Sequence, residues 1–340
     1  MRLKLQRRPF LASGLAAAGL ARFGGRALAD DTRFLRIGTG SVTGTYYPIG
    51  ALIAGALSRP SGARPCTEAG ACGVADLTLV VEASKGSVDN VEAIRAGRIE
   101  TGFAQSDVAY GAYAGTGVFE GQPPLVSLRA LASLYLESIH IVVTPSSGIT
   151  KVADLRGRRV SLDAEGSGTL VDARLILAGF GLTPADLQPV YATPSRSIDL
   201  MREGQLDALF LVAGFPAAAV AELVEAVGAR LLPIVGPPVG TLLKQHRFLT
   251  PADIPGDTYA GIEMGIPTLG VAALWVATAE LDETLAYEIT QALWNPATLK
   301  VLDEGHPKGS EIQAADALRG VAIPVHPGAA RYYRERGLAE

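Results

Sequence analysis

The sequence predicts an α/β protein built as two lobes, each a mainly parallel sheet flanked by helices, with a ligand cleft between the lobes. Short apolar segments alternate with helical patterns along the chain, which is typical of parallel strands joined by helical crossovers. Matching units recur in the same order in both halves of the chain. Hydrophobic residues make up 48% and charged residues 19% of the 340 residues, which is enough apolar material for large buried cores.

The individual elements are predicted from apolar runs, helical periodicity and the Gly and Asp residues that separate them. The expected strands are residues 34–39, 77–82, 101–104, 139–144, 159–162, 208–212 and 270–277. The expected helices are residues 46–57, 87–96, 170–179, 197–203, 215–227 and 280–294.

A sequence pattern that occurs once in each half of the chain, called the internal echo below, supports the division into two lobes. Residues 97–103 and 204–210 align without a gap, 107 residues apart, and each follows a predicted helix that begins with Ser-x-Asp. Upstream, each half also opens with a strand, a Gly-rich loop and a helix, at 37–46 and 160–169. The alternative is two ordinary helix–strand turns, because Gly is common at helix ends.

The first 29 residues differ in charge from the rest of the chain. They contain six basic side chains and no acidic one, so the remaining 311 residues hold 24 Lys and Arg against 34 Asp and Glu. A short apolar stretch precedes Ala27-Leu28-Ala29, which has the form of a cleavage site. We expect a signal peptide of residues 1–29, removed after Ala29, and export to the periplasm. Arg7-Arg8-Pro9-Phe10-Leu11 favours the twin-arginine route, and an amphipathic arm is the alternative.

The mature chain lacks the signals of several functional classes. Its net charge of −10 argues against nucleic-acid binding. Four scattered His and the spacing of Cys66 and Cys72 do not suit zinc, so the cysteines form either a local disulfide or two free thiols. The sequence contains no H-E-x-x-H, G-x-S-x-G or Walker A motif. We expect a monomer without metal or cofactor that is not an enzyme.

Four segments follow predicted strands and carry Gly, Ser, Thr or amide side chains. In open α/β sheets, ligands bind where such loops meet helix N-termini, and free backbone N–H groups there suit a carboxylate or phosphate. Simple helix capping is the alternative for any one of them. The segments are residues 38–47, 105–107, 165–169 and 213–216.

The ordered motifs resemble those of the TAXI-type solute receptors of tripartite ATP-independent periplasmic (TRAP) transporters. The resemblance covers nearly the whole mature chain, although each motif alone is weak. Residues 66–72 are an insertion that varies in that family, and residues 213–216 match only loosely. The matching segments are Ile37-Gly38-Thr39-Gly40 with Gly44-Thr45-Tyr46-Tyr47-Pro48, Ser84-Lys85-Gly86-Ser87-Val88-Asp89-Asn90, Ala104-Gln105-Ser106-Asp107, Asp154-Leu155-Arg156-Gly157, Gly166-Ser167-Gly168-Thr169 and Ile323-Pro324-Val325-His326-Pro327-Gly328.

The resemblance implies a type II-like periplasmic binding protein fold, with residues 30–140 and 270–340 in lobe 1 and residues 141–269 in lobe 2. It implies a receptor that closes on a small organic anion or amino acid, of the glutamate or dicarboxylate type. Integral membrane subunits would then take up the solute with an ion gradient. The alternatives are a periplasmic binding module that feeds a sensor and an enzyme on the same fold.

The resemblance also implies the pocket residues. In lobe 2, Phe215 would cover the apolar part of the solute and a helix N-terminus would bind its anionic group. Tyr46 could instead be a core aromatic, Asp107 a helix cap, and Asn90 a cap or a solvated residue. The implied set is Thr39, Ser41, Thr43, Gly44, Tyr46, Asn90, Gln105, Asp107, Ser167, Gly168, Thr169 and Phe215.

Overall fold

A computed structural model describes residues 32–63 and 73–339, and the structural statements below refer to these residues. The predicted signal peptide and both cysteines, Cys66 and Cys72, lie outside the described residues. Within the described part of the chain, no helix has the length and apolar content that crossing a bilayer requires.

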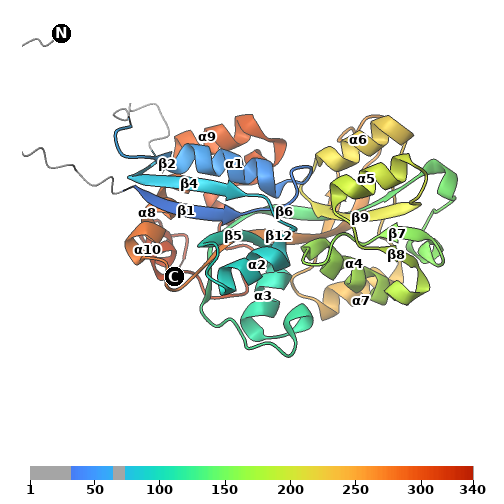
Figure 1. Cartoon of the computed structure of the whole chain (residues 1–340), viewed down its shortest axis with the longest axis horizontal. Coiled ribbons are helices and arrows are strands. Elements are labelled where there is room, and N and C mark those ends of the chain that lie inside the picture. The colour runs from blue at the N-terminus through green and yellow to red at the C-terminus, as the bar shows by residue number, and fades with distance from the viewer. Residues whose placement is uncertain (1–31, 64–72, 340) are drawn as a thin grey trace, which may run out of the picture. The chain divides into compact units, whose positions relative to one another are not determined.

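The described residues form two lobes that share one continuous sheet (Figure 1). Lobe 1 is built from β1 (Arg33–Gly38), α1 (Tyr46–Leu57), β2 (Ser58–Arg59), β3 (Val74–Ala75), β4 (Leu77–Glu82), α2 (Ser87–Arg95), β5 (Thr101–Gln105), α3 (Ser106–Ala114), α8 (Glu283–Leu293), α9 (Pro296–Gly305) and α10 (Pro327–Glu335). Lobe 2 is built from β7 (Arg159–Ser161), α4 (Gly168–Gly179), β8 (Gln188–Val190), α5 (Pro194–Arg202), β9 (Ala208–Ala213), α6 (Ala218–Val227), β10 (Arg230–Leu231), α7 (Pro237–Gln245) and β11 (Thr250–Ile254).

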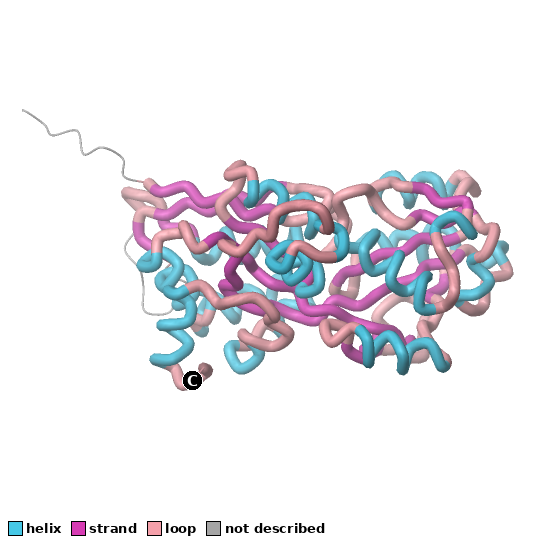
Figure 2. The backbone as a smooth tube through the Cα atoms, turned by 90° about the horizontal axis from the view of Figure 1, so that it is seen from below, coloured by secondary structure: helices cyan, strands magenta, loops and turns pink. Residues whose placement is uncertain are grey.

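Two long strands, β6 (Leu128–Val143) and β12 (Ile266–Thr278), run through both lobes and pair antiparallel with each other. Figure 2 shows them as extended magenta segments that continue from one lobe into the other. Their pairing shifts register between Ala273 and Leu274 and again between Trp275 and Val276. The lobe boundaries expected from the sequence, at 140/141 and 269/270, fall within these strands.

The prediction of mainly parallel sheets is confirmed on each side of this strand pair. In lobe 1, β1 pairs parallel with β4 and β5, and in lobe 2, β7 pairs parallel with β8 and β9. Helices cover both faces, because each sheet buries apolar residues on both sides. In lobe 1, α1, α8, α9 and α10 pack on one face and α2 and α3 on the other. In lobe 2, α4 and α7 pack on one face and α5 and α6 on the other.

The structure contains helices that the sequence analysis did not predict, namely α3, α7, α9 and α10. Three of them begin with proline, which is acceptable at the first helical position because that residue needs no intrahelical N–H partner. His326 is the N-cap of α10, and its Nδ1 accepts a hydrogen bond from Gly328 N at 3.2 Å.

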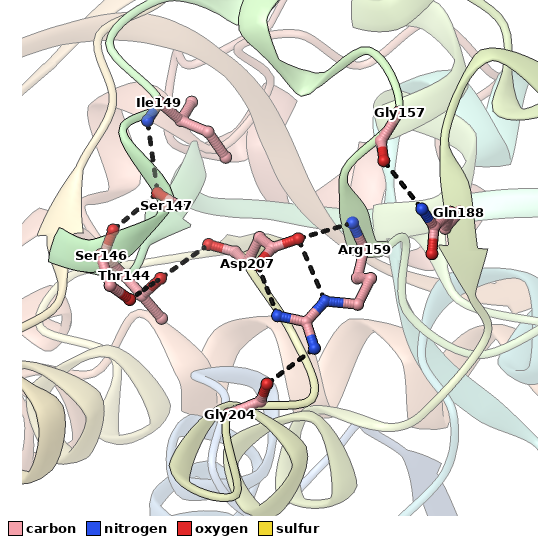
Figure 3. A network of polar contacts seen from close by, with 9 residues as sticks. All are labelled: Thr144, Ser146, Ser147, Ile149, Gly157, Arg159, Gln188, Gly204 and Asp207. Carbon is pink, nitrogen blue, oxygen red and sulfur yellow. Dashed lines mark hydrogen bonds and ion pairs between the residues drawn. The ribbon is translucent and has the colours of Figure 1, made fainter.

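The internal echo appears as a matching Arg–carboxylate contact in each lobe. In lobe 2, Arg159 N and Nε donate to Asp207 Oδ2 at 2.9 and 3.2 Å, and Nη2 donates to Oδ1 at 2.6 Å (Figure 3). In lobe 1, Arg36 N and Nε donate to Glu100 Oε2 at 2.8 and 3.1 Å. Glu100 and Asp207 occupy aligned positions of the echo. Each contact ties the turn before a strand to the neighbouring parallel strand.

Neutralising Asp207 should therefore weaken lobe 2. The hydrogen bond from the Arg159 guanidinium lowers the pKa of the Asp207 carboxyl. The carboxylate thus stabilises the fold above the ordinary Asp pKa of about 4, and this contribution is lost as the pH falls through the lowered value. We expect Asp207→Asn to lower the Tm at neutral pH, and the difference from wild type to shrink below about pH 4, in circular-dichroism melts.

Asp199→Asn is the control for this prediction. Asp199 is exposed and lies 3.8 Å from Arg196 in an ion pair on the surface of α5. Exposed pairs of this kind contribute little to stability, so its melting temperature should stay near that of the wild type. An equal loss of stability in both variants would contradict the role given to Asp207.

Candidate functional site

A cavity of about 60 Å³ lies between the two lobes, at the carboxyl ends of parallel strands from both of them. This is the place where open α/β sheets bind ligands. Loops of both lobes form most of its lining. Strand β6 contributes Glu137, and strand β9 contributes Leu211 and Val212. The lining residues are Gly40, Ser41, Gly44, Thr45, Tyr46, Ser84, Lys85, Gly86, Ser87, Gln105, Glu137, Asp163, Ser167, Gly168, Thr169, Thr193, Pro194, Leu211 and Val212.

Five helices begin at this cavity. Their N-cap residues, Thr45 of α1, Gly86 of α2, Gln105 of α3, Ser167 of α4 and Thr193 of α5, all belong to its lining. No side chain caps the N-termini of α1, α2 and α3 by a hydrogen bond. Each helix N-terminus carries a partial positive charge and outward N–H groups, so their convergence creates an environment that favours an anion.

The lobes touch each other around the cavity, so the structure is a closed arrangement. Asp89 N of α2 donates to Gly166 O at 2.8 Å, and Thr45 Oγ1 donates to Gly214 O at 2.9 Å. On the same side, the ammonium of Lys308 lies 3.5 Å from the centre of the Phe215 ring. These contacts join loops of lobe 1 to loops of lobe 2.

Gly168, the first residue of α4, lies against side chains of the opposite lobe. A Cβ at this position would lie 1.6 Å from Gln105 Oε1 and 2.8 Å from Ser87 Oγ, so a larger residue would have to displace the Gln105 amide. Gln105 is 2% exposed, and its Oε1 has no hydrogen-bond partner within the described residues. A buried amide oxygen without a partner is costly, which makes Gln105 available for a bound molecule.

Two carboxyl groups also line the cavity. Tyr46 Oη donates to Glu137 Oε2 at 2.7 Å, and burial raises the pKa of Glu137 to about 8. Burial likewise raises the pKa of Asp163 to about 7, and Asp163 Oδ1 accepts a hydrogen bond from Ala164 N at 2.6 Å. Among residues 32–63 and 73–339, no group of His, Cys, Asp and Glu side chains is arranged to hold a metal ion.

A family model described as the NMT1-like family matches residues 37–337 of this chain. The chain belongs to the NMT1-like family. This is a family of periplasmic solute-binding proteins, so the expectation of a solute receptor is confirmed at this level. The resemblance to the TAXI type is a finer assignment that family membership leaves open.

Solved structures with low sequence identity share the fold of this NMT1-like protein. PhnD1 from Prochlorococcus marinus (MIT 9301), solved in complex with methylphosphonate, has a TM-score of 0.51 at 12% identity, over 90% of this chain and 97% of that chain. A protein from Bordetella bronchiseptica RB50 has a TM-score of 0.53 at 16% identity, over 90% of this chain and 99% of that chain. A structure described as a periplasmic transporter has a TM-score of 0.50 at 13% identity, over 90% and 98%.

The cavity of this NMT1-like protein brings together more than half of the pocket residues expected from the sequence. Three of these residues lie in lobe 2, where Ser167, Gly168 and Thr169 form the N-terminus of α4. Thr169 Oγ1 also accepts a hydrogen bond from Val212 N at 3.1 Å, which fixes the start of α4 to the end of β9. The expected residues that line the cavity are Ser41, Gly44, Tyr46, Gln105, Ser167, Gly168 and Thr169.

Thr39 and Asn90 do not line the cavity, because their polar groups are used inside lobe 1. Asn90 Nδ2 donates to Thr39 O at 2.6 Å and to Phe103 O at 2.8 Å. Thr39 Oγ1 donates to Glu82 O at 2.7 Å. The expectation that the Asn90 amide donates to a solute is therefore wrong in this structure, since both of its N–H groups hold strand ends together.

The other three expected residues lie beside or behind the cavity. Thr43 O accepts a hydrogen bond from Ala219 N at 3.1 Å, and Phe215 contacts Lys308, so both belong to the contact between lobes. Asp107 is buried in the first turn of α3, whose N-cap is Gln105, so it is neither a cap nor a lining residue.

The sequence analysis missed several lining residues. Those with polar side chains are Thr45, Ser84, Lys85, Ser87, Glu137, Asp163 and Thr193. Glu137 gave one available signal, because it is the only acidic residue in β6, a strand whose residues are mostly apolar. Asp163 follows β7 and has a φ of +71°, an uncommon conformation for a residue with a side chain. Such a backbone near a ligand cleft is a recognised mark of functional sites.

Proposed function

We propose that this protein is a periplasmic receptor that captures a small organic anion, a carboxylate or an amino acid of the glutamate type, in the cleft between its lobes. It then delivers the solute to the integral membrane subunits of a TRAP transporter, which use an ion gradient for uptake. Export by the predicted signal peptide brings the receptor to that compartment.

The observation that carries this proposal is the convergence of five helix N-caps on one cavity. The mature chain has a net charge of −10, so an anion gains nothing from the overall field and must be held locally. Backbone N–H groups and helix dipoles supply that local field without any Arg in the lining. A cavity of about 60 Å³ restricts the solute to a small one in the closed arrangement.

A thermal-shift screen of the mature protein tests the binding function. The panel contains small carboxylates, dicarboxylates, acidic amino acids, sulfonates and phosphonates. A solute at about 100 times its Kd should stabilise the folded state by about 2.7 kcal/mol. Mass spectrometry of molecules released by denaturing freshly purified protein identifies a native solute. No shift with any anion, together with no released anion, would refute the proposal.

The transporter class rests on the ordered TAXI-type motifs, and it has its own test. Uptake by proteoliposomes that contain the membrane subunits encoded beside this protein should need an ion gradient and not ATP. Uptake driven by ATP would refute the TRAP assignment and leave the receptor function intact. A partner with a sensor domain instead of a transporter would support the signalling alternative.

Removing the side chains of Gln105 and Thr169 should weaken binding. Gln105→Ala removes a side-chain amide whose Nε2 can donate to an anion, and Thr169→Ala removes a hydroxyl at the N-terminus of α4. Each change should raise the Kd about tenfold, the effect of one hydrogen bond to a charged group, in calorimetric titrations with the tightest anion of the panel. Gln245→Ala, on the exposed end of α7, is the matched control. Unchanged affinity in both site variants would place the solute elsewhere.

A further inference from the structure

Glu137 enters the cavity from β6, the strand that both lobes share. Its side chain is 2% exposed, and Tyr46 Oη donates to Oε2 at 2.7 Å. It is thus an acidic residue on the floor of a cavity whose other walls present helix N-termini. An ionised Glu137 would repel the anion that those N-termini favour.

No cation forms an ion pair with Glu137 within the described residues. Among the ion pairs of the described residues, none includes this carboxyl group. Lys308 acts on Glu137 electrostatically, but its Nζ donates to Glu311 at 2.6 Å and lies over the Phe215 ring. A buried carboxylate with one hydroxyl donor and no paired cation is unfavourable compared with the neutral acid.

Further carboxyl groups lie behind the cavity and act in the same direction. Asp172 on α4 is 0% exposed, and neither of its oxygens has a partner within the described residues. Asp107 on α3 is also buried, and its Oδ1 has no partner there. Besides burial, the charge of Asp107 raises the pKa of Glu137, and the charges of Asp107 and Glu137 raise the pKa of Asp172. The titratable groups that face this region are Tyr46, Lys85, Asp107, Tyr135, Glu137, Asp163, Asp172, Lys308 and Glu311.

We propose that Glu137 selects solutes by charge: it faces the cavity as a neutral carboxylic acid and donates its O–H to the anionic group of the solute. Ionisation of Glu137 then closes the site to anions. Asp107 acts through Glu137 and is a positioning residue, because its charge disfavours a second charge nearby. The inference rests on the proposed function, since it assumes that the cleft binds an anion.

The direction of the pH dependence follows from this assignment. Burial raises the pKa of Glu137 to about 8, and Asp107 raises it further while Lys308 lowers it. Burial raises the pKa of Asp107 to about 6 and holds the pKa of Asp172 well above its usual range. Anion affinity should be constant below the pKa of Glu137 and fall about tenfold for each pH unit above it.

The test measures the Kd of succinate and of methanesulfonate, two anions that do not titrate between about pH 6.5 and about pH 9.5. The wild type should bind them roughly thirtyfold more weakly at the upper pH. Glu137→Gln cannot ionise but can donate, so its affinity should match the wild type at low pH and stay constant. Glu225→Gln, exposed on α6, should keep the wild-type profile. Asp107→Asn should move the midpoint to lower pH.

The outcomes separate the two proposals. Anion binding with no pH dependence would overturn the role of Glu137 and leave the receptor function standing. Affinity for choline, a permanent cation, that is lost in Glu137→Gln would show that Glu137 acts as a carboxylate. No binding of either anion at any pH refutes the anion receptor and this inference with it. Infrared spectra of the ligand-free protein should show a protonated carboxyl band at neutral pH that is missing in Glu137→Gln, and its absence from the wild type would overturn the inference.

Discussion

Gly168→Val should abolish tight solute binding while leaving the protein folded. The added Cβ would lie 1.6 Å from Gln105 Oε1 and 2.8 Å from Ser87 Oγ, both in the opposite lobe. Because Gln105 and Ser87 are buried, the Gln105 amide can move aside only into the cavity, where it takes the space of the solute, unless the lobes separate. We expect the Kd for the tightest anion of the screen to rise about a hundredfold or more, equivalent to about 2.7 kcal/mol, in calorimetric titrations.

The melting temperature of the ligand-free protein separates this effect from a folding defect. Gly168→Val places its clash between the lobes, so opening relieves it and the Tm without solute should change little. Gly55→Val is the matched control, because a Cβ at Gly55 meets nothing within 4 Å on the exposed side of α1. Tight binding by Gly168→Val would show that the closed arrangement is not the solute-bound one.

Among the substitutions described above and below, Trp275→Ala should cause the largest loss in the free energy of unfolding. Trp275 is 0% exposed and lies on β12, with its ring 6.4 Å from that of Phe103 at an angle of 90°. Phe103 in turn contacts Tyr46 edge-on at 5.5 Å, so these rings connect the core of lobe 1 to the cavity. Truncation of a fully buried aromatic costs about 3–5 kcal/mol, and the Tm should fall on the order of 10 °C in calorimetric scans.

Two further variants control for this prediction. Trp275→Phe should cost much less than alanine, because the indole Nε1 has no partner within the described residues and a phenyl ring keeps most of the contact. Val301→Ala, at an exposed site of α9, should leave the Tm near that of the wild type. Equal losses in the alanine and phenylalanine variants of Trp275 would indicate that the indole is needed for its polar group.

Helices and strands were predicted best where the apolar periodicity agrees with the Gly and Asp residues that separate one element from the next. The expected helix at 46–57 and strand at 77–82 have the bounds of α1 and β4. The rule that ligands bind at the carboxyl ends of parallel strands also placed Ser41, Gln105 and Gly168 at one cavity. These predictions depend on backbone geometry, which the residue pattern determines locally.

The remaining site residues could not be predicted because they depend on packing between distant segments. Asn90 has the right chemistry for a solute contact, but its amide donates to two backbone carbonyls, that of Thr39 directly after β1 and that of Phe103 in β5. Glu137 lies far along β6, a strand of which only the end was predicted, and only the fold of both lobes brings it to the cavity floor. A single acidic residue within a mostly apolar strand was the one local sign of it.

The shared strands β6 and β12 have a consequence for the rate at which a solute leaves. Because β6 and β12 run through both lobes as one antiparallel pair, the lobes stay connected when they open, and we expect the opening to be a hinge rotation about this pair. The contacts from Asp89 to Gly166 and from Thr45 to Gly214 must therefore break together when the lobes rotate apart. The residence time of the solute is then the waiting time for a single collective opening. Under the proposed function, a membrane subunit would control release by lowering that barrier.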